Sequence, residues 1–264
     1  MGEADPGEDV RGSGPPITFT VVDSTQTVAF DLAAAGADDG TVVVADYQRE
    51  GRGRRGRQWR AEPRASLLTS ILVRSRLAMS DLPLYSFAAA LAVADAVTAV
   101  GGCATRLKWP NDVLVDGRKV AGILLESRTQ PPAPPVVAVG IGVNLRQTAF
   151  PDDLAARATS VRLATGRDVN RDDALQALLG AFRRWRAELE QHGFAPLRDR
   201  WLANSDTIGR VVDIDGVRGV AVDLAGDGAL VIAKGCVRRR VVAGEIGWQS
   251  SAVAAPVESD APRR

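Results

Sequence analysis

Residues 51–59 of the chain read Gly51-Arg52-Gly53-Arg54-Arg55-Gly56-Arg57-Gln58-Trp59. From residue 49 to residue 60, six of the twelve residues are arginine and three are glycine, although the whole chain carries a formal net charge of only +1. Guanidinium groups are permanently charged, forked donors that suit carboxylates and phosphates, and glycine allows the backbone to approach a ligand closely. The stretch is therefore predicted to be a flexible loop that clamps an anionic ligand.

The segments on either side of this loop are apolar. Thr41–Asp46 is nearly continuous in apolar residues, which is typical of a strand buried on both faces, and Ser66–Val73 is a second strand of the same kind. The glycines match the G-x-G-x-x-G dinucleotide pattern, but that motif leads from a strand into a helix, whereas here a second strand follows. An arginine-glycine tract that binds RNA is usually repeated in a low-complexity tail, and this one occurs once within a folded core. Both alternatives are disfavoured.

The first hundred residues also predict two helices. Ile17–Val22 alternates like a strand, and Ser24 or Thr25 is placed to cap a helix that stops at Gly36. An alanine-rich helix is expected over Leu82–Val100, ended by a glycine pair.

A second polar cluster follows on a predicted hairpin. Asp116-Gly117 between two apolar runs is a strong hairpin signal, and the hairpin carries two lysines, an amide and a carboxylate: Lys108, Asn111, Asp112 and Lys119. The rigid turn around Pro110 suits reading of a base edge and binding of a divalent cation. A solvated surface hairpin is the alternative for these residues taken alone. The next strand, Val136–Leu145, has Gly140 and Gly142 where something flat can pack, although a bulge would also explain them.

Helices are expected over about 171–191 and 195–203, and after them the spacing of apolar residues changes. From residue 206 only short β-runs separated by glycine turns remain, which predicts a barrel of about 45 residues. We therefore divide the chain into a tail (1–16), a main domain (17–205), a small β domain (206–249) and a second tail (250–264), and expect both tails to be disordered.

Bulk composition narrows the class. With 45% hydrophobic and 25% charged residues, the chain is typical of a soluble globular protein, and balanced charge gives no general attraction to nucleic acid or membrane. Two distant cysteines, Cys103 and Cys236, suggest buried thiols in a reducing cytosol, and a single histidine, His192, excludes a multi-histidine metal site. No secretory signal is visible, and the apolar run Phe87–Val100 is too short to span a bilayer. A cytoplasmic location is expected.

Taken in order, these motifs resemble the biotin protein ligases, that is, biotin-[acetyl-CoA-carboxylase] ligases. The arginine loop, Lys-Trp-Pro-Asn-Asp, Lys-x-Ala-Gly-Ile-Leu-x-Glu, Gly-x-Gly-x-Asn and a late Gly-Glu-Ile all occur in the family's order over about residues 17 to 248. The resemblance implies an α+β fold: a mixed sheet with flanking helices, similar to class II aminoacyl-tRNA synthetases, followed by an SH3-like β-barrel. It also implies ATP and biotin as substrates, Mg²⁺, and a biotin carboxyl carrier protein as acceptor.

The resemblance further implies roles for individual residues. Biotin would be held by Ser24, Thr25, Gln26, Gln48, Arg52, Gly53, Arg54, Lys119, Gly122 and Ile123. ATP would be held by Arg55, Arg57, Trp59, Lys108, Asn111, Asn144, Gly140 and Gly142. Lys119, Lys108 and Arg54 would support catalysis, and Asp112 would help to place Mg²⁺.

The sequence departs from this family in three places. Few residues precede the first strand, so the DNA-binding domain of some relatives is not expected, nor is specific DNA binding; the oligomeric state stays open between monomer and homodimer. Gln26 stands where many relatives have asparagine, and the segment after Glu245 lacks an arginine that some relatives place near ATP. A lipoate or octanoate ligase or transferase of the same fold is the nearest alternative, and a nucleic-acid-binding protein is the alternative from another class.

Overall fold

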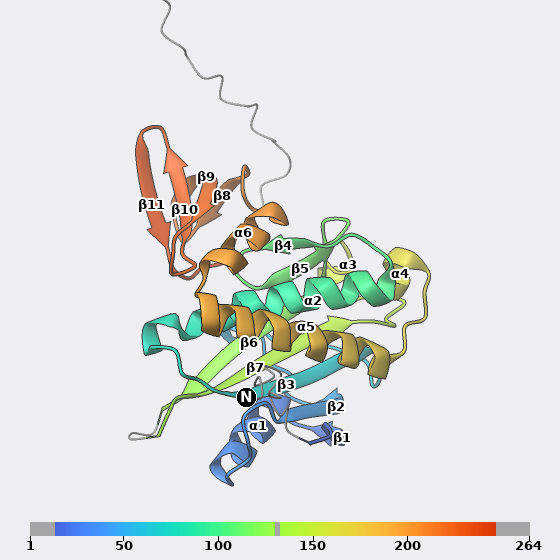
Figure 1. Ribbon diagram of the computed structural model, residues 1–264. Coiled ribbons are helices and arrows are strands. Elements are labelled where there is room, and N and C mark those ends of the chain that lie inside the picture. The colour runs from blue at the N-terminus through green and yellow to red at the C-terminus, as the bar shows by residue number, and fades with distance from the viewer. Residues whose placement is uncertain (1–13, 130–132, 247–264) are drawn as a thin grey trace, which may run out of the picture.

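The computed structural model describes residues 14–129 and 133–246 (Figure 1). The expected tails lie mostly outside these residues. The main sheet has seven strands in the order β1-β2-β3-β7-β6-β5-β4. Their bounds are β1 (Ile17–Val22), β2 (Val42–Gln48), β3 (Ser66–Arg74), β4 (Arg106–Lys108), β5 (Asp112–Val115), β6 (Arg118–Arg128) and β7 (Val136–Asn144). Only β1 and β2 pair in parallel, so the predicted mixed sheet is confirmed.

Two long helices cover one face of this sheet. They are α2 (Tyr85–Gly101), which follows the 3-10 segment η2 (Met79–Leu84), and α5 (Arg171–His192), and Figure 1 shows both in front of the strands. Val139, Ile141 and Val143 of β7 belong to the large core beneath them. Because side chains alternate along a strand, Ala138, Gly140 and Gly142 point to the opposite face. That face is only partly covered by α1 (Thr25–Ala34), through a small cluster that includes Phe30 and Ala138.

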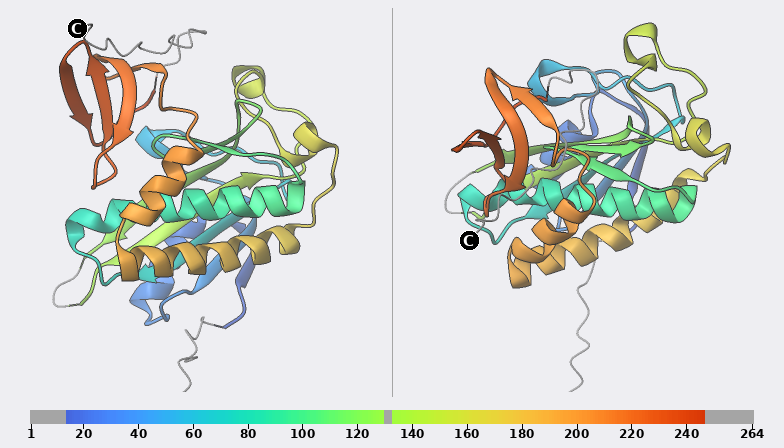
Figure 2. Two further views of the ribbon diagram at one scale, coloured as in Figure 1. Left: turned by 45° about the horizontal axis from the view of Figure 1, so that its top comes forward. Right: turned by 90° about the horizontal axis from the view of Figure 1, so that it is seen from above.

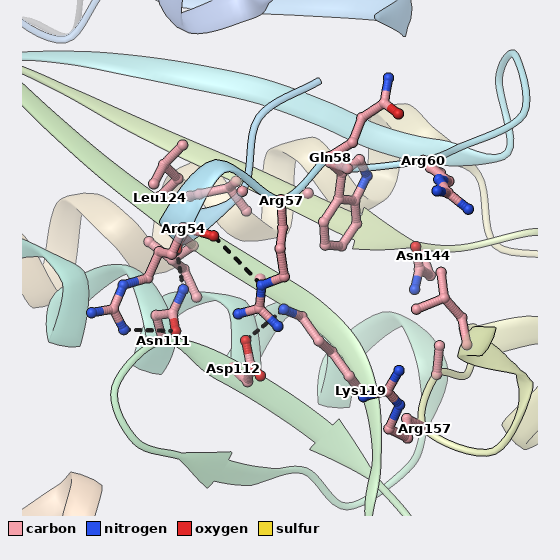
Figure 3. Close-up of a pocket in the computed structure, with 18 of the residues that line it drawn as sticks. Arg54, Arg57, Gln58, Arg60, Asn111, Asp112, Lys119, Leu124, Asn144 and Arg157 are labelled. Carbon is pink, nitrogen blue, oxygen red and sulfur yellow. Dashed lines mark hydrogen bonds and ion pairs between the residues drawn. The ribbon is translucent and has the colours of Figure 1, made fainter. Parts of the chain in front are cut away.

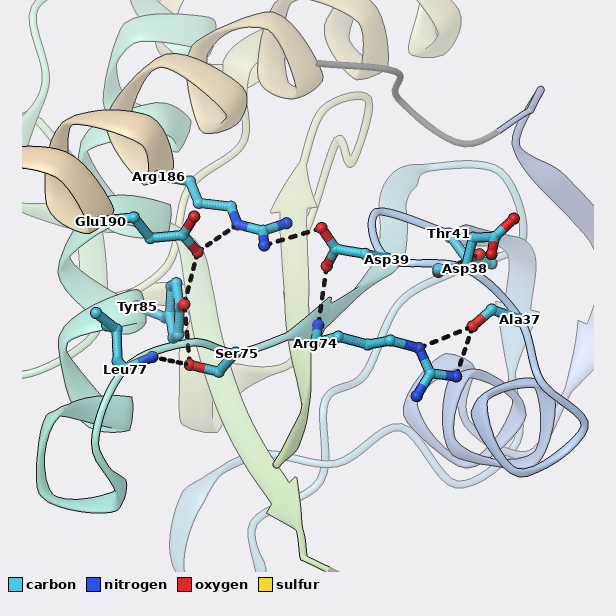
Figure 4. A network of polar contacts seen from close by, with 10 residues as sticks. All are labelled: Ala37, Asp38, Asp39, Thr41, Arg74, Ser75, Leu77, Tyr85, Arg186 and Glu190. Carbon is cyan, nitrogen blue, oxygen red and sulfur yellow. Dashed lines mark hydrogen bonds and ion pairs between the residues drawn. The ribbon is translucent and has the colours of Figure 1, made fainter. Parts of the chain in front are cut away.

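Polar contacts fasten α5 to α2 and to the segment between α1 and β2, beside the end of β3 (Figure 4). The Tyr85 hydroxyl donates to Glu190 Oε1 over 2.7 Å, and Arg186 Nε donates to the same oxygen over 2.8 Å. Arg186 also pairs with Asp39 at 2.9 Å, and the backbone N–H of Arg74 donates to that carboxylate. Burial raises the pKa of Tyr85 well above its usual value, so the hydroxyl keeps its proton as a donor.

The C-terminal unit is a four-stranded antiparallel sheet in the order β11-β10-β9-β8, which confirms the small β unit expected there. Its strands are β8 (Val211–Ile214), β9 (Val217–Leu224), β10 (Leu230–Lys234) and β11 (Val237–Val241), and α6 (Ala195–Ala203) leads into it. Short helical segments α3 (Asp152–Ala155) and α4 (Val161–Thr165) connect β7 to α5. Figure 2 shows the C-terminal unit standing beside one end of the main domain.

Two expectations from the sequence are wrong: the length of the apolar helical segment, and the burial of both cysteines. Together, η2 and α2 form a continuous segment of 23 residues, Met79–Gly101, which is long and apolar enough to cross a membrane by length and composition, although 72% of its apolar window is buried inside the protein. Packing against α5 and the sheet explains that composition. Cys236 is exposed rather than buried, because it lies in the β10–β11 turn, whereas Cys103 is partly buried.

Candidate active site

A cavity of about 930 Å³ lies on the sheet face that α2 and α5 leave uncovered. Every site residue expected from the sequence lines this cavity except Arg55. The cavity thus brings together the loop, the start of α1, the β5–β6 hairpin and β7, four segments that are far apart in the sequence. Figure 3 shows Arg54 and Arg57 of the loop above Asn111, Asp112 and Lys119.

One end of the cavity is polar but uncharged. The Thr25 N–H and hydroxyl both lie within hydrogen-bond distance of Gln48 Oε1, at 2.8 and 3.0 Å, and the Thr25 hydroxyl also contacts the Ser70 hydroxyl at 2.8 Å. Ser24 is the N-cap residue of α1, but its side chain makes no capping hydrogen bond and is buried. The hydroxyls at this helix start therefore serve the cavity wall rather than the helix end.

The floor of the cavity is made of bare backbone. Gly122 on β6 and Gly142 on β7 are register partners. A Cβ added to Gly142 would lie 2.6 Å from the Trp59 indole, and one added to Gly140 would lie 2.8 Å from Gln26 Cδ. The glycines of β7 are expected to leave room for a flat group, and in the structure the indole of Trp59 occupies part of that room.

The other end of the cavity is cationic. Lys119 Nζ lies 2.6 Å from Asp112 Oδ1 and 5.6 Å from the centroid of the Trp59 ring. Burial lowers the pKa of Lys108 from its usual value, and burial likewise lowers the pKa of Arg54. These partly buried cations lack full solvation, so an incoming anion gains more from them than it would from exposed ones.

Asn111 and Asn144 have protein partners of their own. Asn111 Nδ2 donates to Ile123 O over 2.6 Å, while its Oδ1 accepts from Arg54 over 3.4 Å. Asn144 Nδ2 donates to Thr159 O over 3.0 Å and its Oδ1 accepts from Gln147 over 3.2 Å. Asn144 therefore fastens the segment that follows β7 to the cavity wall.

The C-terminal unit supports the turn that carries Asn111 and Asp112. The Trp109 N–H donates to Thr207 Oγ1 over 2.9 Å, and its indole Nε1 donates to Gly228 O over 3.0 Å. Trp109 is 1% exposed. This support was not foreseen, because nothing in the sequence joins residue 109 to residues 207 and 228.

The arginine loop covers the cavity and is fastened by carboxylates from several segments. Arg52 pairs with Glu126 at 2.9 Å, and Arg57 pairs with Glu245 at 2.5 Å. Arg55 Nη2 and Nη1 contact the two oxygens of Asp215 at 2.5 and 3.1 Å, outside the cavity. We call residues 51–59 the lid.

One further wall of the cavity could not be predicted from the sequence. Phe150, Leu154 and Arg157, in and around α3, also line the cavity. The Lys119 N–H donates to Arg157 O over 2.8 Å, which holds this wall against the hairpin. Residues 146–158 lack a clear apolar period, and only their contact with the hairpin reveals their position.

Comparisons with known proteins agree with this arrangement. The family model described as "Biotin/lipoate A/B protein ligase family" matches residues 18–144. The chain is 39% identical over 233 residues to a biotin–[acetyl-CoA-carboxylase] ligase of Paracoccus denitrificans, covering 85% of this chain and 96% of that protein. It is 37% identical over 247 residues to the Mycobacterium tuberculosis protein of the same name, covering 86% and 87%.

Two further comparisons extend this result. The chain is 37% identical over 183 residues to a bifunctional ligase/repressor of Bacillus spizizenii, but spans only 56% of that protein's length. A solved biotin protein ligase from Aquifex aeolicus, in complex with biotin and ATP, matches with a TM-score of 0.77 and 29% identity, covering 88% of this chain and 97% of that one. The chain therefore belongs to the biotin protein ligases of the biotin/lipoate A/B protein ligase family.

Proposed function

We propose that the protein forms biotinoyl-5'-AMP from biotin and ATP, and then transfers biotin to a lysine of a biotin carboxyl carrier domain, such as that of acetyl-CoA carboxylase, in the cytoplasm. The observation that carries the proposal is the single cavity that joins a neutral polar end, at Thr25 and Gln48, to a cationic end, at Lys108 and Lys119. A molecule with a neutral polar head and a carboxylate tail fits these two ends in one orientation.

In the first step, a biotin carboxylate oxygen attacks the α-phosphorus of ATP, and pyrophosphate leaves. The obstacle is to bring two anions together and to stabilise the charge that develops, so positioned cations can supply most of the catalysis without a protein nucleophile. We assign Lys119 to the carboxylate and the reacting phosphate, and Lys108 and Arg57 to the remaining phosphates. Each charge-assisted contact contributes roughly 1.5–3 kcal/mol net.

Trp59 and the glycine floor are assigned to the acyl-adenylate. The indole already lies against Gly142, so the ligand would share this floor with it or shift it. Arg54, with its guanidinium on Asn111, would close the lid over the mixed anhydride. In the second step, the acceptor lysine amine attacks the anhydride carbonyl and AMP leaves. A closed lid protects the anhydride from water until the acceptor arrives.

Asp112 fits the single carboxylate that Mg²⁺ usually takes from a protein when phosphates supply other ligands. Within residues 14–129 and 133–246, no group of three or more metal-binding side chains is found, so a cage made by the protein alone is not the basis of this assignment. When bound, Mg²⁺ would neutralise phosphate charge. Lys119 and Asp112 would then separate, since each has an anion or a cation of the substrate complex as a new partner.

Pyrophosphate exchange tests the proposal. Purified protein is incubated with ATP, labelled pyrophosphate and one acid at a time: biotin, lipoate or octanoate. Exchange that depends on biotin, followed by labelling of a carrier domain but not of its Lys-to-Arg variant, is the expected result. Exchange with lipoate alone would favour the lipoate ligase alternative, and no exchange with any acid, together with tight salt-sensitive RNA binding, would refute the enzyme assignment.

A further inference from the structure

Arg55 differs from the other lid arginines in its direction. Its backbone lies in the left-handed region, at φ 56°, and its side chain points away from the cavity toward Asp215. Asp215 is likewise left-handed, at φ 51°, in the β8–β9 turn of the C-terminal unit. The two residues share two hydrogen bonds, and those bonds hold the pKa of the Asp215 carboxyl below its usual range. Two-point contact fixes the direction of the guanidinium as well as its distance.

A second contact lies two residues further along the lid. Arg57 reaches Glu245, which precedes the buried Ile246. The C-terminal unit that supplies both carboxylates is itself fixed to the main domain, through the Trp109 indole and Gly228. The lid tip therefore contacts a wall that is anchored independently of the lid.

We infer that Asp215 is a positioning residue: through Arg55 it latches the lid to the C-terminal unit and so controls how long the acyl-adenylate is retained. The identity of the retained ligand rests on the proposed function, whereas the contact between Arg55 and Asp215 does not. Asp215 touches no ligand in this scheme and does not line the cavity. Its predicted effect is on opening of the lid, and the intrinsic rate of adenylate formation with the lid closed is unaffected.

The size of the effect follows from exposure. The side chains of Arg55 and Asp215 are 47% and 57% exposed, and exposed ion pairs contribute little. Two-point geometry places this pair at the upper end of that range, so loss of the pair should speed lid opening roughly threefold to fivefold. Salt should screen the latch, because the Debye length falls to about 3 Å at 1 M.

Limited trypsin digestion tests the latch without reference to activity. The lid carries several arginine cleavage sites, and a protease cleaves a segment fastest when it is open, so the cleavage rate should report opening of the lid. We compare wild type, Asp215→Asn, and the charge-swapped double variant Arg55→Asp/Asp215→Arg, following cleavage between residues 49 and 60 by mass spectrometry. Asp227→Asn is the matched control, since Asp227 pairs with Arg240 in the same unit, away from the lid. Thermal unfolding verifies that each variant is folded.

The latch predicts roughly threefold to fivefold faster cleavage in Asp215→Asn, wild-type cleavage in Asp227→Asn, and recovery to within twofold in the charge swap. In 1 M NaCl the wild type should approach Asp215→Asn. If the proteins form the adenylate, it should dissociate from Asp215→Asn faster than from wild type by the same factor, measured after gel filtration. The kcat of pyrophosphate exchange should stay within twofold of wild type. Cleavage unchanged in Asp215→Asn, or a charge swap no better than the single variant, would overturn the latch. Faster cleavage without biotin-dependent exchange would uphold the latch and refute the proposed function.

Discussion

Replacing Gly142 by alanine tests whether the lid tryptophan rests on the sheet. The added Cβ would lie 2.6 Å from Trp59 Cε2 and 2.7 Å from Cζ2, against ordinary contacts of about 3.5–4.0 Å between carbons, so the indole has to move by about 1 Å. The backbone of Gly142 does not need a positive φ, so the strand itself tolerates the change. Overpacking of this kind costs about 1–3 kcal/mol. Because opening of the lid removes the clash, the substitution can cost no more than the free energy that keeps the lid closed.

We therefore expect Gly142→Ala to raise the susceptibility of the lid to trypsin and the KM for biotin by about fivefold or more, from a cost of at least about 1 kcal/mol. Global stability should change less. In a Trp59→Ala background the same substitution should have little effect on lid opening, and this double-mutant cycle isolates the contact. Gly180→Ala is the control: this helical glycine has open space around its Cβ position, so alanine should stabilise by about 0.5–1 kcal/mol. Equal effects of Gly142→Ala with and without Trp59 would refute the packing of the indole on the floor.

Four further outcomes are expected. Lys119→Ala should reduce adenylate formation by about 100-fold or more with the fold intact by circular dichroism, since it removes the cation assigned to the reacting charge; near-normal turnover would exclude that role. Arg54→Gly should release the adenylate before transfer and so increase the labelling of bystander proteins; unchanged labelling would argue against a role of Arg54 in closing the lid. Burial lowers the pKa of Lys108, so adenylate formation should fall at a pH below the ordinary lysine value of 10.5, and Lys108→Arg should move that limb upward; an unmoved limb would assign it to another group. Burial alone would raise the pKa of Asp46, but hydrogen bonds from Arg171 and Arg64 lower it below the ordinary value of 3.8. The ionised carboxylate therefore stabilises the fold above pH 3.8, and this stabilisation is lost as the pH falls through the lowered pKa. Asp46→Asn should cost about 2 kcal/mol at pH 7 in urea unfolding and show a flatter acid limb, whereas parallel acid limbs would contradict this source.

Much of the main domain could be predicted from sequence because its strands carry their own signals. Val42–Gln48 and Ser66–Arg74 are apolar enough to identify as buried strands, and Asp116-Gly117, both at positive φ, makes the hairpin turn that its composition predicts. The fold around the lid followed from these local patterns.

Contacts between distant segments carry no comparable signal. Asp215 marks a turn in the sequence, but nothing there indicates that it meets Arg55 from 160 residues away. Trp109 stands in a recognisable motif, yet its partner is a backbone carbonyl at Gly228, and any residue type offers a carbonyl. The sequence therefore predicts one ligand-binding role for all the lid arginines, whereas in the structure some line the cavity and Arg55 contacts the C-terminal unit.

The paired glycines of β6 and β7 have a consequence for the evolution of ligand choice. Where Gly122 faces Gly142, the cavity wall contains no side chain that a mutation could shorten. Every substitution at these positions adds atoms, so drift there can only narrow the range of acids that enter. A variant that accepts a bulkier acid must therefore arise at lining residues that carry side chains, such as those of the lid, the start of α1 or Ile123, and selection for new specificity should recover substitutions there while the two glycines stay unchanged.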